Sequence, residues 1–115
     1  MTVIANSIRH SHDDGIDVNG AGSTIDGNNV SGSVHDGLDI DSLGSTVQNN
    51  VSNSNGDDGI GVGRNARAVV LRNNITNINA DLGIQPISGT AIDGGGNRAA
   101  GNGDPRQCVR VTCSP

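Results

Sequence analysis

Three aspartates, Asp17, Asp39 and Asp41, have the residue type and the spacing for carboxylate chemistry. Asp17 and Asp39 each lie inside the same short pattern, Ile-Asp-Val and Leu-Asp-Ile, one repeat apart along the chain. Carboxylates that lie close together raise one another's pKa, and they can serve as general acid and base or bind Ca2+. The alternative is a solvated polar face on which these aspartates have no chemical role.

Histidine and arginine supply the remaining candidates for a binding site. His35 lies beside Asp36, and a histidine near carboxylates could act as a base, ligate a metal or contact a substrate. Arg64 and Arg67 could grip the carboxylate of an acidic sugar with paired hydrogen bonds. The alternatives are an exposed histidine on a turn and two arginines that balance an acidic surface.

A second set of aspartates stands immediately before the glycine of each good repeat. Because these aspartates recur, they favour a structural use, an Asx turn that leads into a strand. A catalytic group is normally needed only once. The three residues are Asp14, Asp36 and Asp58.

The elements that must position these side chains are predicted by an internal repeat of about 22 residues. Each repeat contains Gly-[Ile/Leu]-x-[Val/Ile], a short apolar pair after a Gly/Ser turn, and Asn-x-[Val/Ile]. Three short strands in each of four to five repeats predict an all-β, right-handed parallel β-helix with three parallel sheets. The predicted inward columns are Ile16, Leu38, Ile60, Ile84; Val18, Ile40, Val62; Val3, Ile25, Val47, Leu71, Ile92; and Ile8, Val30, Val51, Ile75.

An asparagine column is expected at the bend between the second and third strands of each rung. Stacked side-chain amides can bond from rung to rung, and asparagine tolerates the left-handed backbone of a bend. We therefore assign these residues a structural role. The column is predicted at Asn6, Asn28, Asn49, Asn73 and Asn97.

Composition excludes several function classes. The chain has no aromatic residue and no lysine, and its net charge is −5, which is unfavourable for nucleic-acid binding. No apolar run approaches the roughly 20 residues of a membrane span. Cys108 and Cys113 indicate a local disulfide in an exported protein, or else a metal or redox pair.

The Asp-Gly-Ile-x-Val and Asn-x-Ile units make residues 1–99 resemble the right-handed parallel β-helix repeat family, the pectin-lyase-like superfold. The tail, from Asp93-Gly-Gly-Gly-Asn97 through Cys108 and Cys113, resembles the ending of bacterial exported members. Asp57-Asp58 is similar to the paired aspartates of polygalacturonases, whose Gly-His-Gly and Arg-x-Lys partners this chain lacks.

The resemblance and the aspartates together predict a function on the outer face of the first sheet. There we expect an extended polysaccharide to be bound, or processed by a lyase or a hydrolase. Asp17, Asp39 and Asp41 are the candidate catalytic residues and the candidate Ca2+ ligands, and no other cofactor is expected. The alternative is a non-catalytic structural or adhesion module. An extracellular or cell-surface location follows from the resemblance.

The two ends of the chain are expected to differ. Thr2-Val3 falls on the second strand of a rung, so the chain begins in mid-coil and leaves the first rung uncovered. We therefore expect residues 1–99 to be the C-terminal part of a longer β-helix, inactive alone, with earlier rungs or a second chain over the first rung. Residues 100–115, with Pro105, are expected to cap the other end.

Overall fold

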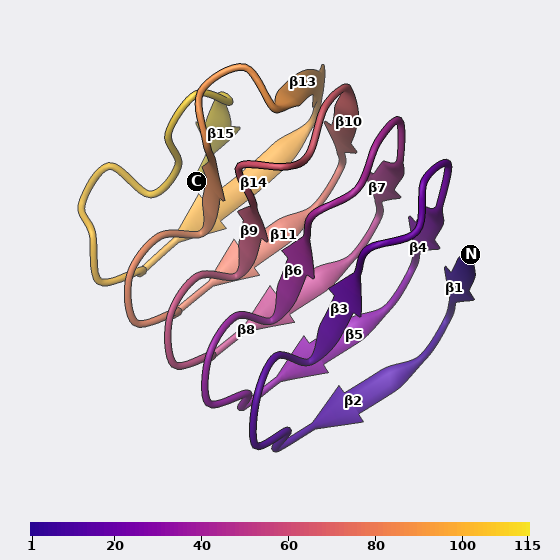
Figure 1. The fold of residues 1–115 in the computed structure, drawn as a ribbon. Coiled ribbons are helices and arrows are strands. Elements are labelled where there is room, and N and C mark those ends of the chain that lie inside the picture. Colours follow the sequence, from indigo (N-terminus) through magenta and orange to yellow (C-terminus); the bar gives the residue numbers. More distant parts are fainter.

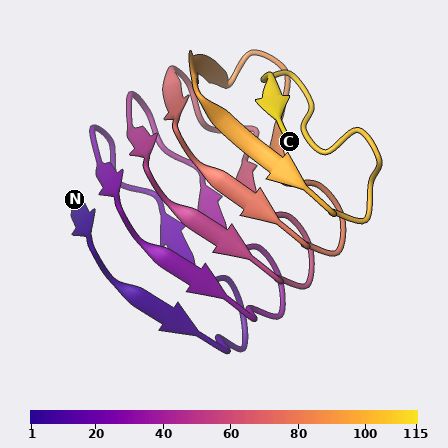
Figure 2. The same ribbon diagram turned by 180° about the vertical axis from the view of Figure 1, so that it is seen from behind.

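The computed structural model describes residues 1–115, which form short β-strands wound into a solenoid of three parallel sheets (Figures 1 and 2). No helix with the length and apolarity needed to cross a membrane is present. Sheet A contains β1 (Thr2–Ile4), β4 (Thr24–Asp26), β7 (Thr46–Gln48), β10 (Val69–Arg72) and β13 (Ala91–Gly95). Sheet B contains β2 (Ser7–Arg9), β5 (Asn29–Ser31), β8 (Val51–Asn53), β11 (Ile75–Asn77), β14 (Asn97–Ala100) and β15 (Cys113–Ser114). Sheet C contains β3 (Ile16–Val18), β6 (Leu38–Ile40), β9 (Ile60–Val62) and β12 (Ile84–Pro86).

Every strand pairs in parallel with the strand one rung away, as the repeat predicts. In sheet C, Ile16 pairs with Leu38, Leu38 with Ile60, and Ile60 with Ile84. Their side chains are buried, and they form one core with Ile25, Val47 and Leu71 of the second strand's column. The prediction of Ile92 as the last member of that column was wrong: Ile92 is exposed, because it pairs with Val70 while Leu71 pairs with Asp93. A fully buried aliphatic side chain contributes about 1.5–3 kcal/mol, so stacked columns stabilise this fold without aromatic residues.

In sheet B, the register differs from the predicted column by one residue. Asn29 pairs with Val51, so Ser52 and Thr76 point inward while Val51 and Ile75 are only partly buried. The buried hydroxyl of Ser52 is satisfied, because it donates to Gly59 O at 2.7 Å. The predicted inward column, Ile8, Val30, Val51, Ile75, was therefore wrong at its last two members.

The asparagine ladder explains that shift. It consists of Asn6, Asn28, Asn50, Asn74 and Asn97, and each of the first four donates from both its backbone N–H and its Nδ2 to the Oδ1 of the next. The prediction of Asn49 and Asn73 was one residue out: both are exposed bend residues with φ of 56° and 53°. Buried amides must be hydrogen-bonded. The ladder therefore fixes the register of sheet B, even though this register leaves Val51 and Ile75 only partly buried.

A second amide ladder, which the sequence analysis missed, follows the bend between sheets B and C. Asn55 donates to Asn79 Oδ1, and Asn79 donates to Asn102 Oδ1, at 2.8–3.0 Å. Gln107 Oε1 accepts the last two hydrogen bonds, from Asn102 N and Nδ2. Asn-Gly and Asn-Ile-Asn at these positions look like ordinary turn sequences, which conceals the ladder.

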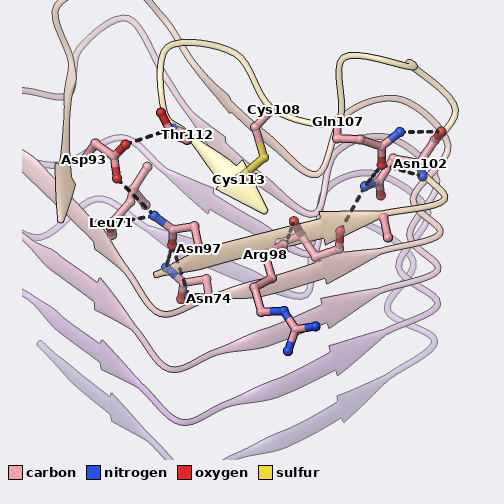
Figure 3. The surroundings of a disulfide bond; sticks show 12 residues. Leu71, Asn74, Asp93, Asn97, Arg98, Asn102, Gln107, Cys108, Thr112 and Cys113 are labelled. Atoms are coloured by element: carbon pink, nitrogen blue, oxygen red, sulfur yellow. Dashed lines mark hydrogen bonds between the residues drawn. A yellow bond between two sulfur atoms is a disulfide. The ribbon is translucent and has the colours of Figure 1, made fainter. Parts of the chain in front are cut away.

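The C-terminal segment lies on the last rung and contains the disulfide Cys108–Cys113, one of the two alternatives left open above. Figure 3 shows it beside the upper ends of both ladders. Val111 is buried against the core, and Cys108 and Cys113 pack against it.

Candidate functional site

The outer face of sheet C brings the predicted aspartates together. Asp17 of β3 pairs directly with Asp39 of β6, and the next two rungs place Gly61 and Gln85 in the same column. Asp39 is half-buried, whereas Asp17 is exposed. The face therefore changes from carboxylates to a glycine at the third rung.

A hollow of about 160 Å3 opens at this glycine, and it is the only one in the molecule. A Cβ on Gly61 would collide with Asp36 Oδ2, and a Cβ on Gly63 would lie 2.6 Å from Asp41 Oδ1. The hollow exists because both positions lack a side chain. Its lining residues are Asp36, Asp39, Asp57, Asp58, Gly61, Val62, Gly63, Gln85 and Ile87.

The aspartates before the glycines connect the rungs along one edge of this hollow. Asp14 Oδ1 accepts the backbone N–H of Asp36, Asp36 Oδ1 that of Asp58, and Asp58 Oδ1 that of Leu82, each at 2.9 Å. These bonds join successive rungs and replace the predicted Asx turns. Only one oxygen of each carboxylate is used, and Asp36 Oδ2 lies over Gly61.

The pKa of Asp36 and of Asp58 is raised to about 7, chiefly by burial and also by neighbouring carboxylates, including that of Asp57. The hydrogen bond that each accepts from a backbone N–H opposes this increase. Burial, followed by the charge of Asp14, raises the pKa of Asp39 to about 6. Near neutral pH the hollow therefore holds both protonated and ionised carboxyls, which can donate and accept protons.

Two of the three predicted catalytic residues have other partners. Asp41 accepts hydrogen bonds from Asn65 N and Nδ2, both at 3.0 Å, and so holds the loop after β9. Asp17 accepts one from Asn19 Nδ2 at 3.0 Å. Asp39 is the only one of the three that lines the hollow.

The predicted substrate-binding residues lie outside the hollow. Arg67 Nη1 donates to Arg64 O and Ala66 O, which turns its guanidinium onto its own loop. His35 Nε2 lies 3.8 Å from Asp13 Oδ1, with both side chains exposed. The lining contains no cationic side chain, so the carboxylates are the only charged groups that an acidic sugar would meet there.

The carboxylates placed to bind a cation differ from the predicted set, which was Asp17, Asp39 and Asp41. Asp36, Asp57 and Asp58 each offer one carboxylate oxygen, and these oxygens lie within 4.8 Å of one another. An all-oxygen set of this kind suits Ca2+ chemically, although one oxygen of Asp58 is already bonded to Leu82 N–H.

Asp36 and Asp58 were missed as site residues because the Asp-Gly pair recurs on every good rung. The available signal was the change from Asp17 and Asp39 to Gly61 on the next rung of the same column. That change removes the side chain that would otherwise cover Asp36.

Comparison with known proteins gives one match. The family model described as "Right handed beta helix region" matches residues 1–113, nearly the whole chain. No curated protein and no solved structure matches the chain.

Proposed function

This chain belongs to the right-handed β-helix family, and from that premise we propose that it binds an extended polysaccharide along the outer face of sheet C. The observation that carries the proposal is the hollow at Gly61, between Asp36, Asp39 and Gln85. A flat parallel sheet supports a linear chain of sugars, and the hollow admits one residue of that chain. Carboxylates and a side-chain amide are suitable partners for sugar hydroxyls.

The electrostatics of the hollow favour a neutral glycan. Four aspartates line it and no arginine does, so the carboxylate of a uronate would be repelled. An acidic glycan would need a bridging cation, for which Asp36, Asp57 and Asp58 provide oxygens. The two substrate classes are thus distinguished by whether binding requires Ca2+.

Processing of the glycan would be a hydrolysis. A protonated Asp36 would donate its proton to the bridging glycosidic oxygen as that bond breaks. The ionised carboxylate of Asp39 would take a proton from the water that attacks the sugar carbon. The pKa of about 7 for Asp36 and about 6 for Asp39 supports this division of roles at near-neutral pH.

The second candidate function is a non-catalytic structural or adhesion module. The rung-to-rung bonds of Asp36 and Asp58 favour it, because they give both aspartates an architectural use. In either case an extracellular or cell-surface location is supported by the disulfide, since disulfides persist in oxidising compartments.

Glycan-array binding with and without Ca2+, followed by an assay for new reducing ends, tests the proposal. Asp39→Asn should abolish cleavage, and Gly61→Val, which fills the hollow, should weaken binding about tenfold or more. Thr24→Ala on sheet A is the matched control and should bind normally. Absence of glycan binding by the unmodified chain would remove the proposal and leave the structural module.

A further inference from the structure

The acidic residues of this chain are concentrated on one side of the solenoid. All of its aspartates except Asp26, Asp93 and Asp104 lie in the strands of sheet C or in the loops directly before and after them. The hollow at Gly61 lies on this side, on the adjacent rungs of β6, β9 and β12 (Figure 1). Each of these strands pairs or bridges with another segment on both sides, so the hollow belongs to the interior of the stack.

Most carboxylate oxygens in the hollow have no hydrogen-bond partner in the chain. Asp36 Oδ1 and Asp58 Oδ1 each accept one backbone N–H at 2.9 Å, and no group donates to their Oδ2 atoms. The carboxylates of Asp39 and Asp57, which also line the hollow, accept no hydrogen bond from the protein. Because Asp58 exposes only 3% of its surface, its free oxygen can be satisfied only from within the hollow.

Three of the lining carboxylates converge on one place. Asp36, Asp57 and Asp58 each bring one oxygen within 4.8 Å of the oxygens of the other two. An ammonium group carries three N–H donors and no acceptor, so it can bond to several such oxygens at once. No side chain of the chain provides a cation there, because the lining contains neither arginine nor histidine. A ligand with an ammonium group would supply the charge that the hollow lacks.

An ammonium suits this set better than a metal ion does. Ca2+ takes roughly six to eight oxygen ligands, and Asp36 and Asp58 have each already given one oxygen to a backbone N–H. An ammonium needs only three acceptors. Its charge is opposite to that of every lining aspartate, and this attraction is stronger in a partly buried hollow than in water. The electrostatic argument against a uronate therefore favours an aminated sugar over an uncharged one.

We propose that the glycan bound in the hollow is an amino glycan, built from 2-amino-2-deoxy sugars whose nitrogen is a free ammonium. This inference rests on the proposed function and narrows its substrate class. The ammonium is held by Asp57 and Asp58. In such a sugar the carbon that bears the nitrogen adjoins the carbon of the glycosidic bond, so that bond lies beside Asp36 and Asp39, the acid and the base proposed above.

A basic peptide is the competing source of an ammonium group. Lysine carries its ammonium on a flexible four-carbon stem, whose freedom is lost on binding. A sugar ring holds its ammonium beside hydroxyls that can bond to Asp39 and Gln85 in the same hollow. Because Gly61 and Gly63 both lack a side chain, the hollow extends over two outward positions, which suits a ring. These features favour the amino glycan.

Isothermal titration calorimetry near pH 6 with three matched ligands tests the proposal. The ligands are glucosamine, N-acetylglucosamine and glucose oligomers of equal length and linkage, of which only the first carries ammonium groups. The glucosamine oligomer should bind about tenfold or more tightly than the other two, and added salt should reduce this advantage.

Equal affinities for the three oligomers would overturn the inference and leave the proposed function in place. The same conclusion would follow if the chain bound none of the three but bound other glycans on the array. A chain that binds no glycan of any kind would remove both proposals. Polylysine that bound as tightly as the glucosamine oligomer would assign the site to a basic peptide and overturn the inference.

Two matched variants test the position of the ammonium. Asp57→Asn removes one charge from the hollow at an exposed side chain that makes no hydrogen bond, and it should weaken binding of the glucosamine oligomer about tenfold. Asp13→Asn removes the same charge from the same place in the Asp-Asp-Gly pattern, two rungs earlier and outside the hollow, and should leave the affinity within about twofold. Equal losses in the two variants, or no loss in Asp57→Asn, would contradict the site.

Discussion

Two neighbouring asparagines on the third rung should differ sharply in their effect on stability. Asn50 is fully buried, accepts from Asn28, and donates to Ile25 O and Asn74 Oδ1 at 2.9 and 3.1 Å. Asn50→Ala leaves those groups unpaired, so we expect it to lower the free energy of unfolding by about 3 kcal/mol or more. Asn49→Ala, at an exposed bend with φ of 56°, loses one exposed hydrogen bond from Nδ2 to Asp26 Oδ1 and should cost about 1 kcal/mol. Urea denaturation of both variants checks this, and equal losses would contradict the ladder register.

A serine, Ser33, occupies the position just before the second ladder begins. Ser33 stands one rung before Asn55, is buried, and its Oγ has no hydrogen-bond partner. Asn79 Nδ2, two rungs on, donates to the strand carbonyl of Ser52. Ser33→Asn would extend this pattern by one rung, because its Nδ2 could donate to Asn55 Oδ1 and to a carbonyl of β2.

We expect Ser33→Asn to raise the free energy of unfolding by about 0.5–1.5 kcal/mol. Ser54→Asn, at an exposed bend with φ of 59°, is the control and should change it much less. Thermal and urea unfolding measure the effect, and a loss of stability would show that the bend cannot hold the larger amide.

At the scale of the element, the edge of sheet C should make stability depend on pH. The pKa of Asp36 and of Asp58, about 7, lies above the ordinary 3.8 of an aspartate. Between these values the folded chain binds more protons than the unfolded chain, so stability is highest at the acid end and falls as pH rises from about 4 to 7. The urea midpoint should therefore be higher at pH 5 than at pH 8.

Amide substitution should flatten this pH dependence. Asp58→Asn keeps an oxygen for Leu82 N–H and removes the titrating carboxyl, so the urea midpoint of this variant should differ less between pH 5 and pH 8 than that of the unmodified chain. A midpoint that rose with pH in the unmodified chain would contradict the raised pKa values.

The sheets differ in how well their strand pairing and burial could be predicted from the sequence. In sheet C, aliphatic residues alternate with polar ones at a constant period, so pairing and burial could be predicted for Ile16, Leu38 and Ile60. In sheet B, Val51 and Ile75 suggested the wrong register, because the energy that decides it comes from buried amide bonds between rungs. Such bonds depend on residues 22 to 24 positions apart and leave no local pattern.

At the scale of the whole molecule, the site arises from differences between rungs. The aspartate column was visible in the sequence, but the hollow needs Gly61 on one rung, Asp36 and Asp39 on the rung before, and Gln85 on the rung after. A repeat identifies which residues share a column. It does not show that the side chain of Asp36 extends over Gly61, where the column has no side chain. Asp36 and Asp58 were therefore assigned to turns.

The spacing of the rungs depends on a column of glycines that precedes sheet C. A Cβ on Gly59 would lie 2.7 Å from both Gly83 O and Asn79 Nδ2, so backbone of the next rung occupies that space. Gly59→Ala must therefore push two rungs apart and strain the second ladder, and we expect it to abolish cooperative folding or cost about 4 kcal/mol or more.

Gly44→Ala is the matched control for this loss. Gly44 has a φ of 65° with open space around its Cβ position, so alanine there should cost only about 1 kcal/mol of backbone strain. Thermal unfolding followed by circular dichroism compares the two variants. If Gly59→Ala were as stable as Gly44→Ala, the rungs would have to separate freely, and the close stacking on which the ladders and the hollow depend would not hold.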